Sequence, residues 1–529
     1  MRKEFYIISA VIFALIFAGR LIYPDITIAL WVVVPLFLIG LRDAAQNRQT
    51  IRKNYPVIGN IRYLFEKIRP EIQQYFIEHD TDGLPISRVF RSVVYQRAKK
   101  AIETVPFGTL ENVYAPNYEW VNHSVRPTEV EDEALRVTIG GDDCLQPYSC
   151  SLLNISAMSY GSLSKNAVMA FNGGAKLGGF YQNTGEGGIS PYHKNAGGDL
   201  VWQVGTGYFG CRTKDGNFCP ESFKQTAAEP NVKMIELKLS QGAKPGHGGI
   251  LPKEKVTPEI AEIRGVPMDQ DVLSPGAHKA FDTPKGLMEF IKKMRDLSDG
   301  KPIGFKLCIG YQEEFLSICK AMIATGIYPD FISVDGSEGG TGAAPLELTN
   351  SVGTPLEDAL VFVHNTLLGF NIRQKVKIIA AGKVITAFHM VNRMALGADI
   401  INSARAMMLS IGCIQALRCH ENVCPAGVAT TDPNLYRGLN VNNKAVRCAN
   451  FHGRTMKAFR ELIEIVGVQK PSQLRRHHIQ RRITGVGAVN LEEIHPYLEK
   501  GTLLEAPYPI AYQRVMEKAD LECFPETHL

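Results

Sequence analysis

The chain has 529 residues, of which 45% are hydrophobic and 21% are charged, an ordinary composition for a globular protein larger than one typical domain. Its formal net charge of +5 is too small to indicate a nucleic-acid partner. Eleven cysteines, an odd number without regular spacing, exclude an extracellular disulfide framework and indicate a reducing compartment.

Two apolar runs, residues 5–18 and 26–41, stand at the start of the chain and are joined by a short turn. Each run is near the lower limit of about 17–20 residues that a membrane-spanning helix requires. Basic residues precede the first run and follow the second, so the positive-inside rule places both ends in the cytoplasm. The sequence predicts a transmembrane helical hairpin over residues 1–45, a location in the cell membrane and a cytoplasmic catalytic part. A buried core hairpin and a cleaved signal peptide are the alternatives.

Three further segments follow the apolar runs. Residues 46–120 are basic and mixed in character, which indicates a juxtamembrane segment that leads into the catalytic part. We expect the main domain over residues 121–450 and a C-terminal helical extension over residues 451–529.

Eight short apolar runs follow one another from about residue 150, and each ends in a glycine-rich or polar loop that leads into a helix-like stretch. The runs are LLNISAM, GFYQNT, LVWQVGTG, MIELKLS, IGFKLCIG, FISVDG, KIIAAG and DIINSA. Eight strands alternating with helices predict a (β/α)8 TIM barrel of the α/β class, with the active site at the C-terminal ends of the strands. A doubly wound open sheet is the alternative, but no G-x-G-x-x-G motif follows the first strand.

The loops after the first two strands suit close contact with a ligand. The first, over residues 156–164, is rich in small side chains that leave room for a flat ring at the strand end. The second, over residues 183–188, places Glu186 among glycines. We expect burial to raise the pKa of Glu186 so that it takes part in proton transfer. The alternative is a loop carboxylate in solvent.

Two lysines belong to the fourth and fifth strand units. Lys244, in the loop after the fourth strand, is expected near the barrel mouth, where it could stabilise negative charge on a reduced flavin or a substrate carboxylate. A solvated lysine is the alternative. Lys306 lies within the apolar fifth strand, where a charge requires a partner. That partner is either a charged ligand or a buried carboxylate.

Three loops of small residues follow the last three strands, over residues 335–342, 380–383 and 403–405. Barrels that bind a phosphate use backbone amides and helix N-termini after the seventh and eighth strands. The pattern therefore indicates a phosphorylated cofactor.

Cys413, Cys419 and Cys424 follow the last strand, and Pro425 comes directly after the third cysteine. Three thiols so close in sequence can hold one iron–sulfur cluster, and a Cys-Pro step is common in such loops. Three ligands suit a three-iron cluster or a cluster with one open iron. The alternative is three buried thiols that pack as small hydrophobic side chains.

Four motifs carry a family resemblance: NTGEGG, QGAKPGHGG, GSEGGTGAAP and CIQALRCHENVCPAGVATTDP. In order and spacing they resemble the FMN-binding synthase domain of glutamate synthases, from about residue 91 to about residue 448. The resemblance implies FMN in the barrel mouth and a 3Fe-4S cluster bound by Cys413, Cys419 and Cys424. It also implies reduction of 2-iminoglutarate, formed from 2-oxoglutarate and ammonia, to L-glutamate by an oxidoreductase acting on CH-NH2 groups.

The resemblance assigns roles to individual positions. Glu186 and Lys244 match catalytic positions, and Arg264, with Gly185 and Gly187, matches the substrate site, where an arginine can clamp a carboxylate. The flavin-binding positions are matched by Met158, Ser159, Asn183, Gln203, Lys306, Gly339, Gly340, Gly382, Ala404 and Arg405.

Two positions depart from the family pattern. His247 replaces a glutamate, and Ile250 replaces a glutamine that helps to hold 2-oxoglutarate. An apolar side chain leaves substrate oxygens without a donor, which puts the exact substrate in doubt. The alternatives are an FMN oxidoreductase acting on another amino or imino acid and a membrane-linked flavin/iron–sulfur electron-transfer subunit.

Other parts of the larger glutamate synthases are not expected in this chain, namely the amidotransferase domain with its nucleophilic cysteine and the C-terminal β-helix domain. Ammonia would then come from solution or from a separate glutaminase. No NAD(P)H-binding fingerprint is evident, so we expect electrons from ferredoxin, a reductase subunit or a membrane donor.

Overall fold

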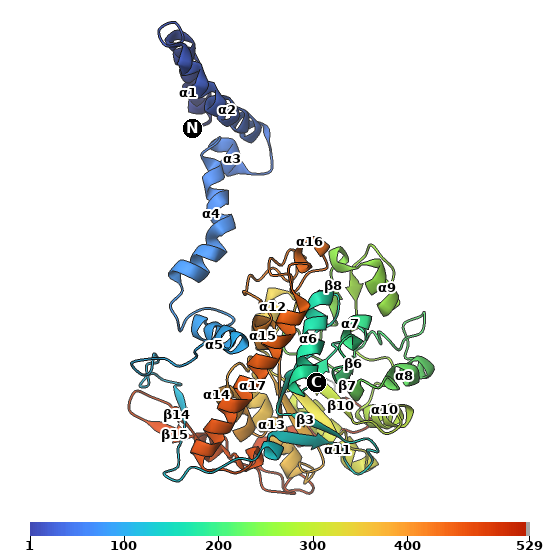
Figure 1. The fold of residues 1–529 in the computed structure, drawn as a ribbon. Coiled ribbons are helices and arrows are strands. Elements are labelled where there is room, and N and C mark those ends of the chain that lie inside the picture. The colour runs from blue at the N-terminus through green and yellow to red at the C-terminus, as the bar shows by residue number, and fades with distance from the viewer. Residues whose placement is uncertain (525–529) are drawn as a thin grey trace. The chain divides into compact units, whose positions relative to one another are not determined.

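The computed structural model describes residues 1–524 and divides the chain between Arg88 and Val89 into two compact units (Figure 1). The domain boundaries expected at residues 45, 120 and 450 stay predictions. The helix α17 (Val441–Val466) runs through position 450 without a break.

The first unit is helical. It contains α1 (Arg2–Gly19), η1 (Pro24–Ala29), α2 (Leu30–Ala45), α3 (Thr50–Asn54), α4 (Gly59–Ile72) and η2 (Gln73–Ile77). The helices α1 and α2 pack through the rings of Phe5 and Phe37, whose centroids are 5.9 Å apart. Gly40 makes this contact possible, because a Cβ atom there would lie 2.2 Å from the Phe5 ring.

One helix in the described part of the chain, Pro24–Ala45, is long and apolar enough to cross a membrane. The other half of the expected hairpin, α1, is shorter in apolar length because Arg2, Lys3 and Glu4 occupy its first turn. The paired helices are thus present, while the transmembrane hairpin stays a prediction.

A closed barrel of eight parallel strands forms the centre of the second unit. Its strands are β4 (Leu153–Ile155), β5 (Gln182–Asn183), β6 (Leu200–Val204), β7 (Val232–Lys238), β10 (Ile303–Leu307), β11 (Phe331–Asp335), β12 (Lys377–Ala381) and β13 (Ile400–Ser403). Each of the eight apolar runs in the sequence overlaps one of these strands, and β13 closes the barrel by pairing with β4. The predicted (β/α)8 barrel is confirmed.

Helices surround the barrel. They are α6 (Lys165–Gly178), α7 (Pro191–Lys194), α8 (Pro220–Ala227), α9 (Pro258–Arg264), α10 (Pro284–Leu297), α11 (Gln312–Thr325), α12 (Leu346–Ser351), α13 (Leu356–Gly369), α14 (Ala387–Ala395), α15 (Arg405–Ser410), α16 (Pro433–Tyr436) and α17. The long α17 packs against α6 (Figure 1), where Gly174 leaves room for Cys448. The cysteine-bearing loop, residues 411–432, connects α15 to α16, and its Gly427 accepts a hydrogen bond from Ser164, the N-cap residue of α6.

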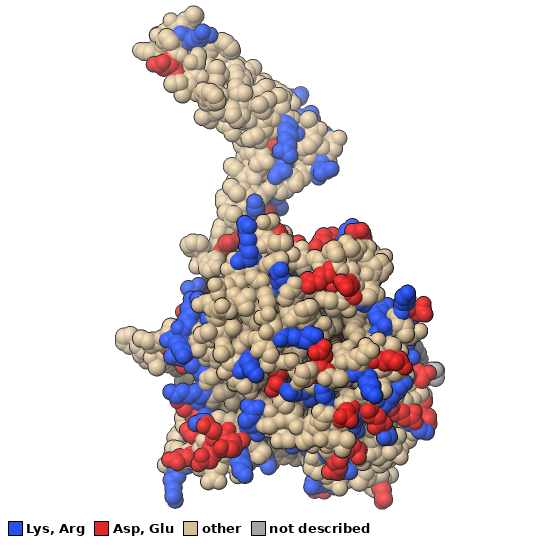
Figure 2. Space-filling model, turned by 45° about the vertical axis from the view of Figure 1, so that its right-hand side comes forward, with Lys and Arg blue, Asp and Glu red and all other residues tan. Residues whose placement is uncertain are grey.

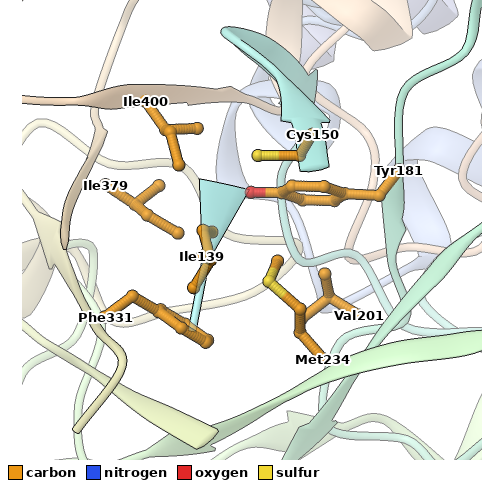
Figure 3. Packing of buried hydrophobic residues seen from close by; sticks show 8 residues of the cluster. All are labelled: Ile139, Cys150, Tyr181, Val201, Met234, Phe331, Ile379 and Ile400. Carbon is orange, nitrogen blue, oxygen red and sulfur yellow. The ribbon is translucent and has the colours of Figure 1, made fainter. Parts of the chain in front are cut away.

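A hairpin of β2 (Arg136–Ile139) and β3 (Tyr148–Ser151) closes the end of the barrel where the strands begin (Figure 3). Ile139 and Cys150 from this hairpin are fully buried. They pack against side chains that point inward from the barrel strands or directly precede them: Tyr181, Val201, Met234, Phe331, Ile379 and Ile400. Because this end is filled with apolar side chains, the opposite end is the open mouth.

A second, antiparallel sheet joins segments on either side of the barrel in sequence. It consists of β1 (Glu119–Val121), β14 (Ile479–Arg482) and β15 (Ala488–Asn490). The remaining elements of the second unit are α5 (Arg88–Lys99), η3 (Asp132–Leu135), β8 (Ile250–Leu251), η4 (Lys253–Lys255), β9 (Val272–Leu273), η5 (Pro471–Gln473), η6 (Arg476–His478), α18 (Leu491–Ile494) and α19 (Ile510–Lys518). The C-terminal segment is therefore mixed, with strands as well as the expected helices.

Candidate active site

An ion pair between Glu186 and Lys238 stands at the barrel mouth. Glu186 lies on the loop after β5 and Lys238 ends β7, and the carboxylate and ammonium are 2.7 Å apart. The side chains are only 16% and 8% exposed. Two glycines give the carboxylate its space, because a Cβ atom at Gly205 or Gly249 would lie within 2.6 Å or 2.5 Å of its oxygens.

The charge state of Glu186 differs from the sequence-based expectation. Burial alone would raise the pKa of this carboxyl group, but the positive charges of Lys238, Lys244 and Arg264 outweigh it and hold the pKa below its usual value. The expectation of a raised pKa was therefore wrong. Glu186 is a carboxylate at neutral pH, ready to accept a proton or a hydrogen bond.

Lys244 is 3% exposed and donates a hydrogen bond to the carbonyl oxygen of Ala343 at 3.1 Å. The alternative of a solvated lysine is thereby excluded. Burial, together with the neighbouring charge of Lys238, lowers the pKa of Lys244 to about 8, while Glu186 opposes this shift. An amine with this pKa exchanges protons readily near neutral pH.

Lys306 pairs with a protein carboxylate, as one of the two sequence-based alternatives expected. Its ammonium lies 3.1 Å from Asp335, and both side chains are buried. Burial would lower the pKa of Lys306, but the charges of Asp335 and Glu236 raise it above its usual value. Asp335 also accepts a hydrogen bond from the amide of Gly242 at 3.0 Å, and so links the loop after β7 to β10 and β11.

Glu236 and Lys238 are the functional candidates that the sequence analysis missed. Glu236 is 1% exposed and accepts hydrogen bonds from Asn183 at 2.8 Å and from Gln203 at 2.6 Å. The signal was present in the strand MIELKLS, because two charged residues spaced by two on an apolar barrel strand share one face. Two of the predicted flavin positions, Asn183 and Gln203, therefore contact one buried carboxylate.

Arg264, the last residue of α9, is 5% exposed and donates to the carbonyl oxygen of Tyr160 at 3.1 Å. Burial lowers its pKa to about 10, and the charge of Glu186 opposes this. In the described part of the chain its Nε has no hydrogen-bond partner. A buried guanidinium with a free donor is suited to receive a carboxylate.

Glycines bring the first two loops close to Arg264. At Gly187 a Cβ atom would lie 2.9 Å from the guanidinium. At Gly185, where φ is +66°, it would lie 2.5 Å from the amide nitrogen of Ser159 and 2.8 Å from the carbonyl carbon of Met158. The structure thus gathers these five predicted residues in one place.

The loops after β11, β12 and β13 also meet. Arg405 donates to the carbonyl oxygen of Glu338 at 2.5 Å, directly before Gly339 and Gly340, and a Cβ atom at Gly340 would lie 3.1 Å from its Nε. Gly382 has φ of +144° and Ala404 is the N-cap residue of α15.

Two cations among these loops, Lys383 and Arg405, lie close enough for their charges to interact. Burial and the nearby charge of Arg405 lower the pKa of Lys383, and burial also lowers the pKa of Arg405. Two basic side chains in a cradle of small residues favour an anion such as a phosphate.

Cys413, Cys419 and Cys424 lie close enough to influence one another. Burial raises the pKa of Cys413 to about 12, and the other two sulfurs add to this. The pKa of Cys419 is also raised, by burial and by Cys424, while the charge of Lys255 opposes the rise. The described residues contain no group of three or more His, Cys, Asp or Glu side chains arranged around a single metal ion. A multi-iron cluster is larger than one ion and separates its thiolates more widely, so the iron–sulfur site stays a prediction.

Comparisons with known proteins identify the family of this chain. A family model described as the conserved region in glutamate synthase matches residues 128–469. The glutamate synthase large subunit-like protein YerD of Bacillus subtilis is 36% identical over 512 residues, covering 88% of this chain and 97% of that protein.

An archaeal-type glutamate synthase [NADPH] of Thermotoga maritima is 33% identical over 334 residues, and the match covers 63% of this chain and 62% of that enzyme. A solved structure of flavocytochrome b2 with sulfite bound covers 79% of this chain and 85% of its own, at 11% identity and a TM-score of 0.41. From the family match and the relatives, this chain belongs to the glutamate synthase family and is a glutamate-synthase-like oxidoreductase that acts on CH-NH2 groups.

Proposed function

We propose that this protein reduces 2-iminoglutarate, formed from 2-oxoglutarate and ammonia, to L-glutamate, with FMN and a 3Fe-4S cluster as cofactors. The observation that carries the proposal is the convergence of Glu186, Lys244 and Arg264 at the barrel mouth, where the three charges influence one another. A site with buried cations and one carboxylate suits a dicarboxylic 2-oxo acid that condenses with ammonia.

The residues at the mouth fit FMN. The cradle formed by Gly339, Gly340, Gly382 and Ala404 would hold the phosphate, with Arg405 supplying positive charge. The ring positions would be lined by Met158, Ser159, Asn183, Gln203 and Lys306. When bound and reduced by two electrons, FMN would supply the hydride for reduction of the imine.

The substrate would be bound and prepared by protein side chains. The free Nε of Arg264 would receive a substrate carboxylate, and Gly185 and Gly187 allow the close approach. Lys244, with its pKa of about 8, can give a proton to the departing oxygen when the imine forms. Glu186, held as an anion, can take a proton from the attacking nitrogen.

Cys413, Cys419 and Cys424 would hold the 3Fe-4S cluster, which carries electrons one at a time from an external donor. Ferredoxin or a reductase subunit is the proposed donor of electrons, and the ammonia would come from solution or from a separate glutaminase. The N-terminal helices would anchor the protein in the cell membrane, with the catalytic unit in the cytoplasm. In support, the face of the paired helices seen in Figure 2 has charged side chains towards its two ends and none between them.

A second substrate class is favoured by one observation. Ile250 follows Gly249, which lies against the Glu186 carboxylate, and the Ile250 side chain has no polar atom to offer a substrate. The His247 side chain is exposed and its Nδ1 lies 3.0 Å from the carbonyl oxygen of Gly248. An imino acid with a less polar group at that place would also fit the site.

The decisive experiment is a reoxidation assay on the reduced holoenzyme. Mixed anaerobically with 2-oxoglutarate and ammonium, it should reoxidise and form glutamate, and Glu186→Gln should abolish this while the flavin stays bound. Reoxidation by another pair from a panel of 2-oxo acids and amines would assign the second substrate class. Reoxidation by none of them would contradict the proposal and favour an electron-transfer subunit.

A further inference from the structure

Lys255 is a buried cation that the proposed reaction does not use. It ends the short helix η4, and the whole residue is 2% exposed. Its ammonium donates hydrogen bonds to the carbonyl oxygens of Ser162 at 3.2 Å and Ala429 at 3.1 Å. These neutral acceptors satisfy two of its three protons but do not balance its charge.

In the described part of the chain, no carboxylate balances this ammonium. None of the described carboxylates lies within ion-pair distance of Lys255, whereas Lys238 and Lys306 at the barrel mouth each have a carboxylate partner. Cys419 and Cys424 lie close enough to Lys255 that their charges, as thiolates, would stabilise its ammonium. A buried, unpaired charge is costly, and so Lys255 is a counter-charge that needs an anion in the cysteine-bearing loop.

The position of Lys255 connects two parts of the site. Asn422, between Cys419 and Cys424, donates to the carbonyl oxygen of Glu254 at 2.9 Å, which holds the cysteine-bearing loop against η4. On the other side, Ser164 donates to the carbonyl oxygen of Gly427 at 2.7 Å. Lys255 therefore lies in the seam between the cysteine-bearing loop and the loop after β4, where the flavin ring is proposed.

We infer that Lys255 is the built-in counter-ion of the iron–sulfur cluster and sets its reduction potential above the value that the three thiolates alone would give. The inference rests on the proposed cluster and deepens it. One-electron reduction adds a negative charge to the cluster, and a fixed cation beside it stabilises the reduced form more than the oxidised form. Lys255 is not a ligand of the iron. It acts on the cluster only through its positive charge.

The test is a redox titration of the full-length holoenzyme with dithionite, followed by the electron paramagnetic resonance signal of the oxidised three-iron cluster. Replacing the charge in Lys255→Met should make the cluster at least about tenfold harder to reduce, which is about 60 mV lower in midpoint potential for one electron. Lys255→Arg should keep the potential of the unchanged protein. The matched control is Lys253→Met, which removes an exposed lysine two residues away and should leave the potential unchanged.

Each result has a definite meaning. An unchanged potential in a Lys255→Met protein with full iron content would overturn the inference, as would an equal shift in Lys253→Met. If Lys255→Met does not retain iron, the arginine variant decides: full iron and an unchanged potential support the counter-ion, and loss of iron shows that Lys255 only holds the loop. If the unchanged protein binds no iron, the proposed cluster itself fails, which is a separate result.

Discussion

Removing Lys238 provides the strongest test of the electrostatics at the barrel mouth. At 2.7 Å and an effective dielectric constant near 20, its attraction to Glu186 is about 6 kcal/mol before the cost of desolvation. In Lys238→Met the carboxylate stays buried without its nearest cation. Breaking a buried pair in this way costs about 3–5 kcal/mol, and we expect the free energy of unfolding at pH 7 to fall by this amount.

The pH dependence of this stability loss shows whether the unpaired charge of Glu186 causes it. The pKa of Glu186 is lowered in the folded protein, so its ion pair stabilises the protein above the usual pKa and is lost as the pH falls through the lowered value. Without Lys238, burial dominates and the pKa rises. The deficit of the variant should therefore be large at pH 7 and should shrink towards pH 5, as Glu186 takes up a proton.

The assay is urea unfolding of the purified protein at pH 5 and pH 7, followed by circular dichroism. The matched control is Lys233→Met on the same strand, where a lysine 39% exposed faces Asp199 at 4.0 Å and should contribute about 0–1 kcal/mol. Adding Glu186→Gln to Lys238→Met should restore most of the loss. A cost below about 1 kcal/mol, or a double variant no more stable than the single one, would refute the argument.

Three other variants test separate parts of the site. Gly249→Ala places a Cβ atom 2.5 Å from a Glu186 oxygen and should lower kcat/KM by about tenfold or more, whereas Gly453→Ala, with no neighbour within 4 Å, should have no such effect in the same steady-state assay. If protonated Lys244 is required, kcat/KM should fall above about pH 8, and an arginine at this position should remove that limb from the pH profile of any residual activity; an unchanged profile would assign the limb to another group. Cys419→Ser should lower the iron content of purified protein, while Cys219→Ser, outside the loop, should retain it; equal iron in both would contradict the proposed ligands.

The barrel was predictable from sequence because its information is local. Each strand is a short apolar run that ends in a small or polar residue, and the helix that follows has its own apolar face. The antiparallel sheet of β1, β14 and β15 was not predictable in the same way. The partners Val121 and Ile479 lie far apart in the chain, and no local pattern specifies their register.

In the candidate site, too, local features were predictable from sequence and features that depend on distant residues were not. The glycines around Glu186 marked its loop as a place of close approach, which the structure supports with Gly205 and Gly249. The pKa of Glu186 is lowered because three cations, from β7, the following loop and α9, outweigh the effect of burial. Burial alone predicts a raised pKa. The partner of Glu186 was not predictable from local sequence, because Lys238 lies on β7, 52 residues away, and only the closed barrel brings the two side chains together.

The pairing of β1 with β14 has a consequence for synthesis of the protein. Residues 119–121 leave the ribosome about 360 residues before their partners at 479–482, an interval of roughly 20–70 s at usual rates of elongation. All eight barrel strands are made within that interval. The barrel can therefore close while the chain is still growing, and the late arrival of β14 then fastens the entry segment to a core that has already formed.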